Sequence, residues 1–91
     1  MAIRAVFPGT FDPIHFGHID IAQRGCRLFD ELVIAVYDKP LKDLFFAPDE
    51  RLDMVSTAFA GNNKITVMGY NCLTVDFCHR IGAKVVLRGL R

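Results

Sequence analysis

Two histidines stand three residues apart in the stretch Pro8–His18, which reads PGTFDPIHFGH. The stretch follows a short apolar run, and it opens with Pro, Gly, Thr and Asp, residue types that supply the backbone geometry of turns. Turn geometry does not account for His15 and His18, whose spacing places both side chains on the same side of a helix start. An imidazole N–H in that position can stabilise oxygen charge that grows in a transition state.

A helix that begins here would add unsatisfied backbone N–H groups and the positive end of its dipole, and both favour a phosphate group. Gly17 would leave room for a ligand to approach the backbone, and Thr10 would add a hydroxyl donor. Lys42, Arg88 and Arg91 supply cations that could align a polyphosphate with an attacking phosphate. Together these residues indicate a phosphate-binding site.

The elements that must position these residues follow from the apolar pattern. Runs of strand length alternate with amphipathic segments of helix length, which predicts a parallel sheet covered by helices. The expected strands are 3–7, 32–37, 65–68 and 84–87, and the expected helices are 17–29, 48–60 and 73–81. Right-handed crossovers in the order 3-2-1-4 would place the first and fourth strands side by side. The loop 8–18 and the final RGLR would then face each other at the carboxyl edge, where ligands of such sheets bind.

Composition narrows the function classes. The chain has 91 residues, with a net charge of +1 and interspersed signs, so it has no broad basic field for nucleic acid or an anionic membrane. No apolar run approaches the ~20 residues that cross a bilayer, and the N-terminus lacks the features of a signal peptide. We therefore expect residues 1–91 to form a single cytoplasmic domain.

The histidine pair also has simpler interpretations. His15 and His18 could bind a metal ion together with Asp12 or Asp20, although the spacing is not H-E-x-x-H and the third ligand is unconvincing. They could also be surface residues without a role. Asp12, which precedes a proline, is expected to be a helix cap or a turn residue.

The cations and aromatic residues have alternatives of the same kind. Lys42 could be a solvated loop lysine, and Arg88 and Arg91 could form surface ion pairs, which contribute little to stability. Three aromatic side chains are expected to pack rather than to stack on a base: Tyr37, Phe45 and Phe46.

Several segments carry a family resemblance. GTFDPIHFGH resembles the HxGH signature of the nucleotidyltransferase superfamily, which also includes class I aminoacyl-tRNA synthetases and cytidylyltransferases. The signature alone does not choose among them. The spacing to Lys42 and four further segments make the whole chain similar to the bacterial phosphopantetheine adenylyltransferases: AVFPGTFDP, FAPDER at 46–51, LTVDF at 73–77 and VVLRGLR at 85–91.

The resemblance implies a Rossmann-like fold and the reversible transfer of adenylate from ATP to 4'-phosphopantetheine, which gives dephospho-coenzyme A and pyrophosphate. The attacking phosphate is already ionised, so no general base is needed. The implied catalytic residues are His18, which stabilises the transition state, with Thr10, Lys42 and Arg88. ATP would contact Thr10, Phe11, His18, Gly89, Leu90 and Arg91, and phosphopantetheine would contact Thr10, Lys42, Thr74 and Arg88.

The resemblance also bears on the remaining site residues and on the partners. His15, which stands where many members carry Thr, and Gly17 complete the implied site. The expected cofactor is Mg²⁺, bound with ATP mainly through phosphates, and no metal site is expected in the protein itself. The implied partners are ATP and 4'-phosphopantetheine, and the family forms hexamers, so a homo-oligomer is expected.

Family members are longer than this chain. We therefore expect these residues to be an N-terminal part, truncated before the last strand and the C-terminal helices, and the activity of this part alone is an open question. One alternative is another HxGH nucleotidyltransferase of cytidylyltransferase type. The other is a non-catalytic binding or assembly fragment that exposes an apolar sheet surface.

Overall fold

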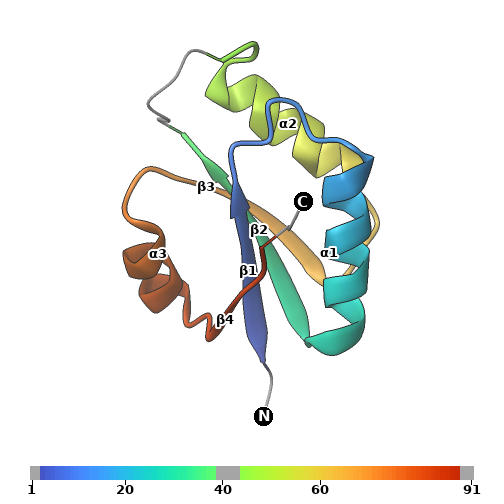
Figure 1. Ribbon diagram of the computed structural model, residues 1–91, viewed down its shortest axis with the longest axis vertical. Coiled ribbons are helices and arrows are strands. Elements are labelled where there is room, and N and C mark those ends of the chain that lie inside the picture. Colours follow the sequence, from blue (N-terminus) through green and yellow to red (C-terminus); the bar gives the residue numbers. More distant parts are fainter. Residues whose placement is uncertain (1–2, 39–43, 89–91) are drawn as a thin grey trace.

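A four-stranded parallel sheet with the order β3-β2-β1-β4 forms the centre of the computed structural model (Figure 1). The structure describes residues 3–38 and 44–88. The strands are β1 (Arg4–Gly9), β2 (Glu31–Tyr37), β3 (Ile65–Tyr70) and β4 (Val85–Val86). The predicted α/β class and strand order are thereby confirmed.

Three helices cover the two faces of this sheet (Figure 1). α1 (Phe16–Leu28) and α2 (Pro48–Ala58) lie on one face, and α3 (Thr74–Ile81) lies on the other. The strands β1 and β2 between them are almost continuously apolar, as strands buried on both faces must be. Within the described ranges, no helix is long and apolar enough to cross a membrane.

Some boundaries differ from the prediction. β3 continues past Met68 to Tyr70 because it stays paired with β2 as far as Tyr37. β4 covers two residues instead of four. The residues on either side still bond to β1, since Lys84 N–H donates to the Arg4 carbonyl at 3.1 Å and Leu87 N–H donates to the Val6 carbonyl at 2.8 Å.

The third helix begins one residue later than predicted. Leu73 is its N-cap, and the Leu73 side chain is 73% exposed rather than part of the buried stripe. The apolar face of α3 is therefore carried by Phe77 and Cys78, which are buried against Val6 and Val33 of the sheet.

All four strands are parallel, so their carboxyl ends meet at one edge of the sheet. β1 leads there into the loop 10–15 and the start of α1, and β4 leads to Arg88. This edge is where the sequence predicts the phosphate-binding site.

Candidate functional site

The two histidines form a reciprocal cap at the start of α1. His15 is the N-cap residue, and its Nδ1 accepts the Gly17 backbone N–H at 3.1 Å. The backbone N–H of His15 in turn donates to Nδ1 of His18 at 3.1 Å. The two rings stack with centroids 3.7 Å apart. Because Nδ1 of His18 accepts a hydrogen bond, the neutral ring carries its hydrogen on Nε2.

Gly17 is required by this cap. A Cβ atom at Gly17 would lie 2.9 Å from Cε1 of His15, so a larger residue would displace the His15 ring. The sequence predicts room at Gly17 for an approaching ligand, whereas in the structure the His15 ring occupies this space.

Asp12 acts at long range rather than as a helix cap. Its two carboxylate oxygens accept the backbone N–H groups of Phe45 at 2.7 Å and Phe46 at 2.9 Å. The prediction of a turn residue is confirmed, and the cap itself is His15. Asp12 thus joins the loop after β1 to the segment that leads into α2.

Phe11 has an unusual backbone. Its φ is 51°, in the left-handed region that side chains other than glycine rarely adopt. Its side chain is only 2% exposed and lies against Phe7 and His18, with ring centroids 5.5 Å and 4.7 Å away. The strained backbone therefore places an aromatic ring directly against the predicted transition-state stabiliser.

Thr74 and Arg88 line a second part of this region, a cavity of about 640 Å³ between α3 and β4. Thr74 is the first residue of α3, and its hydroxyl lies 3.0 Å from the Tyr70 hydroxyl. Arg88 is exposed. None of the ion pairs in the described part of the chain involves Arg88, so the alternative of a surface ion pair has no support for this residue there.

The structure therefore brings together part of the predicted site. Four of its residues meet at the start of α1: Phe11, His15, Gly17 and His18. Thr10 directly follows β1 and precedes Phe11. Arg88 follows β4, the neighbour of β1, and shares a cavity with Thr74. Four predicted residues lie outside the described ranges: Lys42, Gly89, Leu90 and Arg91.

One aromatic prediction is wrong. Phe45 is 89% exposed, whereas Tyr37 and Phe46 are half-buried.

Among residues 3–38 and 44–88, no group of three or more His, Cys, Asp or Glu side chains is arranged to hold a metal ion.

A residue that the sequence analysis missed lies beneath the loop. The guanidinium of Arg51 in α2 is fully buried and donates four hydrogen bonds to backbone carbonyls. The acceptors are Thr10 at 2.9 Å, Tyr37 at 2.7 Å, Asp38 at 3.2 Å and Phe46 at 3.2 Å. A sequence signal for its burial exists, since Arg51 shares the i, i+4, i+8 stripe of α2 with the buried Val55 and Phe59.

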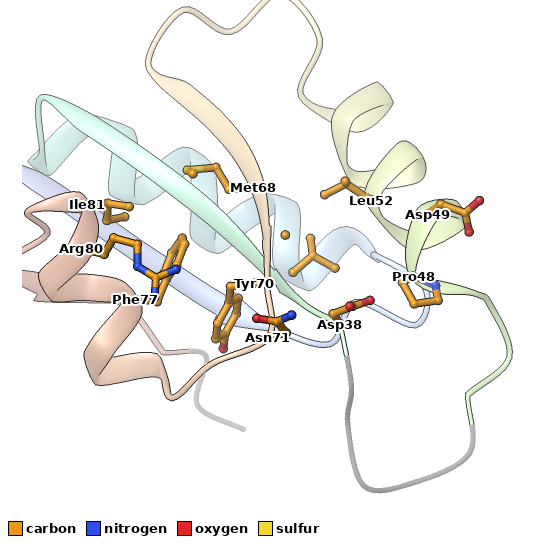
Figure 2. A pocket seen from close by; sticks show the side chains of 12 residues that line it. Asp38, Pro48, Asp49, Leu52, Met68, Tyr70, Asn71, Phe77, Arg80 and Ile81 are labelled. Carbon is orange, nitrogen blue, oxygen red and sulfur yellow. The ribbon is translucent and has the colours of Figure 1, made fainter.

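A further pocket of about 470 Å³ was also not predicted (Figure 2). It lies between α2, the edge strand β3 and α3. Its walls are mainly apolar, with Leu52, Met68 and Phe77 among them, and Asp38 and Arg80 supply charge. It opens at the sheet edge away from β4, so it is separate from the cavity that Thr74 and Arg88 line.

The chain is similar to known nucleotide-transferring enzymes in sequence. A family model described as cytidylyltransferase-like matches residues 6–91. A phosphopantetheine adenylyltransferase of Chloroflexus aggregans is 46% identical over 87 residues, which are 96% of this chain and 54% of that protein. The phosphopantetheine adenylyltransferase of Aquifex aeolicus is 46% identical over 91 residues, which are 100% of this chain and 56% of that protein. The chain thus spans about half the length of the curated relatives it matches.

A solved structure shares the fold. The lipopolysaccharide core biosynthesis protein of Thermoplasma volcanium superposes with a TM-score of 0.75 at 24% identity, over 94% of this chain and 73% of that one. The likeness inferred from the sequence motifs to phosphopantetheine adenylyltransferases is confirmed by the identities above. With a family model that matches nearly its whole length, the chain belongs to the cytidylyltransferase-like family.

Proposed function

We propose that this chain carries the substrate-binding edge of a nucleotidyltransferase that moves adenylate from ATP to 4'-phosphopantetheine and yields dephospho-coenzyme A and pyrophosphate. The observation that carries the proposal is the hydrogen-bonded histidine pair at the start of α1, at the carboxyl edge of the sheet. Its sequence context supports the choice of reaction, since the whole chain is 46% identical to a protein named for it.

In the proposed reaction, an oxygen of the 4'-phosphate attacks the α-phosphorus of ATP. The bond from that phosphorus to the oxygen bridging it to the β-phosphate breaks, and pyrophosphate leaves with the electron pair. The attacking phosphate is ionised at neutral pH, so the protein has no proton to remove. Its contributions are alignment and the stabilisation of charge on the oxygens of the α-phosphate.

We assign the charge stabilisation to His18. Its Nδ1 accepts from the His15 backbone, so its Nε2–H is the donor for an α-phosphate oxygen. Thr10, immediately after β1, would orient the attacking phosphate through its hydroxyl, and Phe11 would contact ATP as well as His18. His15 and Gly17 would act by fixing the start of α1.

We assign the phosphopantetheine phosphate to Arg88 and Lys42, with the pantetheine arm in the cavity that Thr74 and Arg88 line. A cation after β4 would face a phosphate held by the loop after β1, because the two strands are neighbours and parallel. Gly89, Leu90 and Arg91 are proposed to contact ATP.

Mg²⁺ would enter with ATP. The described residues contain no group of three or more His, Cys, Asp or Glu side chains arranged to hold a metal ion, and the carboxylate of Asp12 accepts two backbone N–H groups. The phosphates would therefore supply most of the ligands, as is usual for this ion, which would neutralise part of their charge.

The direct test is release of pyrophosphate from ATP, Mg²⁺ and 4'-phosphopantetheine. It should be run on this chain and on a chimera that joins it to the part of the Aquifex aeolicus relative beyond the matched region. We expect turnover by the chimera that depends on both substrates. A folded chimera without turnover would overturn the proposal.

A second candidate is a cytidylyltransferase, which the description of the matching family model favours. Calorimetry with ATP and CTP decides between the two. If CTP binds more tightly than ATP, the cytidylyltransferase assignment is preferred over the adenylyltransferase assignment. We also propose a homo-oligomer, because the family resemblance implies a hexamer, and a cytoplasmic location, which the sequence favours. Sedimentation of the chimera tests the assembly.

A further inference from the structure

Arg51 is the one buried charged side chain in the described part of the chain. All three of its guanidinium nitrogens donate, Nε to Phe46, Nη1 to Thr10 and Tyr37, and Nη2 to Asp38. These carbonyls belong to three separate segments: the loop after β1, the end of β2 and the approach to α2. A single side chain therefore joins three segments at this edge of the sheet.

Stability does not explain an arginine at this position. Removing a charge from water is costly, and well-packed apolar side chains often replace buried charges without loss of stability. Within residues 3–38 and 44–88, neither ion pair involves Arg51, and the groups that accept from its guanidinium are backbone carbonyls. Arg51 also lies near the N-terminus of α2, where the helix dipole disfavours a cation. What only arginine offers is a planar fork of donors with fixed directions.

The backbone of the loop that Arg51 contacts must be fixed by hydrogen bonds from other segments. Phe11, with its positive φ, lies between Thr10 and Asp12. Arg51 binds the Thr10 carbonyl on one side, and Asp12 binds Phe45 and Phe46 on the other. A strained backbone persists only where its surroundings fix it from several directions. Both restraints end on the same segment, because Arg51 also binds the Phe46 carbonyl.

The contact between Phe11 and His18 connects the restrained loop backbone to the histidine pair. The Phe11 ring lies 4.7 Å from the His18 ring, edge to face. A shift of Thr10 would turn the backbone of Phe11 and move the surface against which His18 packs. A misplacement of about 1 Å can cost a reaction on the order of 10²-fold in rate.

We propose that Arg51 is a positioning residue, which holds Thr10 and, through Phe11, the imidazole of His18 in the geometry for transfer. This inference rests on the proposed function, and it assigns the effect to the geometry of the fork rather than to its charge. A lysine would keep the charge but lose the planar fork, so Arg51→Lys should behave much like the uncharged Arg51→Met.

The experiment compares Arg51→Lys, Arg51→Met and the control Arg24→Met. Arg24 is exposed on α1, and its ion-pair partner among the described residues is Asp20, so its substitution removes the same charge from a position outside the loop. In the chimera we expect both Arg51 variants to lower kcat by about 10²-fold while KM changes less than about threefold. The Arg24 variant should stay within about twofold of the parent in both parameters.

Amide NMR spectra of the same variants give a readout that needs no activity. Changes in chemical shift should concentrate in residues 10–18, 37–38 and 45–47, and they should be similar for lysine and methionine. If lysine restores kcat, charge and not geometry is responsible. Changes spread evenly over α2, or an unchanged kcat, would overturn the positioning role.

The two proposals fail in different ways. A folded parent chimera that lacks turnover overturns the proposed function, and the spectra still decide whether Arg51 fixes the loop. If Arg51→Met does not fold, Arg51→Lys carries the kinetic test. If neither variant folds, Arg51 is a folding residue and the positioning role is overturned.

Discussion

The loop after β1 and the segment after β4 reach the same edge of the sheet, but they are held there by different means. The loop is fixed by Arg51 at Thr10, by the two hydrogen bonds of Asp12 and by the reciprocal caps at the start of α1. Arg88 is exposed, and it follows a strand of two residues whose partner in the described part of the sheet is β1.

The fixed loop and the less restrained segment after β4 suit two different roles, stabilisation of the transition state and capture of a substrate phosphate. A group that stabilises transition-state charge is effective only when it is already in place, because reorganisation during the reaction would reduce the stabilisation. A group that captures a substrate phosphate can adjust as the phosphate arrives. Substitutions in the fixed loop should therefore lower turnover, whereas substitutions at the segment after β4 should raise KM.

The largest effect is expected at His18. His18→Asn keeps an acceptor for the His15 backbone N–H but removes the donor that corresponds to Nε2. We expect kcat for pyrophosphate release by the chimera to fall about 10²- to 10³-fold, with little change in substrate binding.

Two further variants calibrate the His18 result. His18→Gln places an amide donor near the position of Nε2 and should recover part of kcat. Gln23→Ala, at an exposed position on the same helix, should match the parent. Equal losses in kcat and in binding for His18→Asn would contradict the division between the two halves of the site.

Arg88 should give the next largest effect. Loss of a charge-assisted hydrogen bond to a phosphate is worth about 1.5–3 kcal/mol, so Arg88→Ala should raise KM for phosphopantetheine about 10- to 100-fold. Arg88→Lys should recover part of this loss, because a cation remains. Steady-state kinetics with ATP at saturation measures the change, and a fall in kcat at unchanged KM would move Arg88 into the catalytic half.

Asp12 tests how the loop is held. Asp12→Ala removes the acceptor of two backbone N–H groups and should lower the free energy of unfolding by about 1–2 kcal/mol in urea titrations. The matched control is Asp20→Ala, whose exposed pair with Arg24 at 3.3 Å should contribute less than about 0.5 kcal/mol. Similar values for the two variants would show that the loop does not depend on Asp12.

The smallest effect concerns the cap at His15. His15→Ala should lower the free energy of unfolding by about 1 kcal/mol, whereas His15→Asn, a favourable N-cap residue, should stay within a few tenths. Thermal and urea unfolding measure both. If asparagine is as destabilising as alanine, the stacking of His15 on His18 is the stabilising contact rather than the cap.

Much of the scaffold could be predicted because its signals are local. The apolar runs around Val6 and Val33 and the handedness of crossovers determine the strand order, and Pro48 marks the start of α2. The site was predictable as far as its residues follow strands directly, as Thr10 and Arg88 do.

The supports of the site were not predictable in this way. The helical stripe places Arg51 on the buried face of α2, but its bonding could not be predicted, because its four acceptors lie in segments that only the tertiary fold brings together. Asp12 bonds to residues more than thirty positions away. His15 is not a usual N-cap residue, so its capping role emerges only from the geometry.

The short β4 strand has a consequence for amide hydrogen exchange. Lys84 and Leu87 donate to β1 on either side of a two-residue strand, so their amides should exchange through local opening well before those inside β1 and β2. A substrate held by Arg88 would keep this strand closed and slow the exchange of both amides. The measured affinity for that substrate would then include the free energy of closing β4, and recognition at this end of the sheet would be in part a local folding reaction.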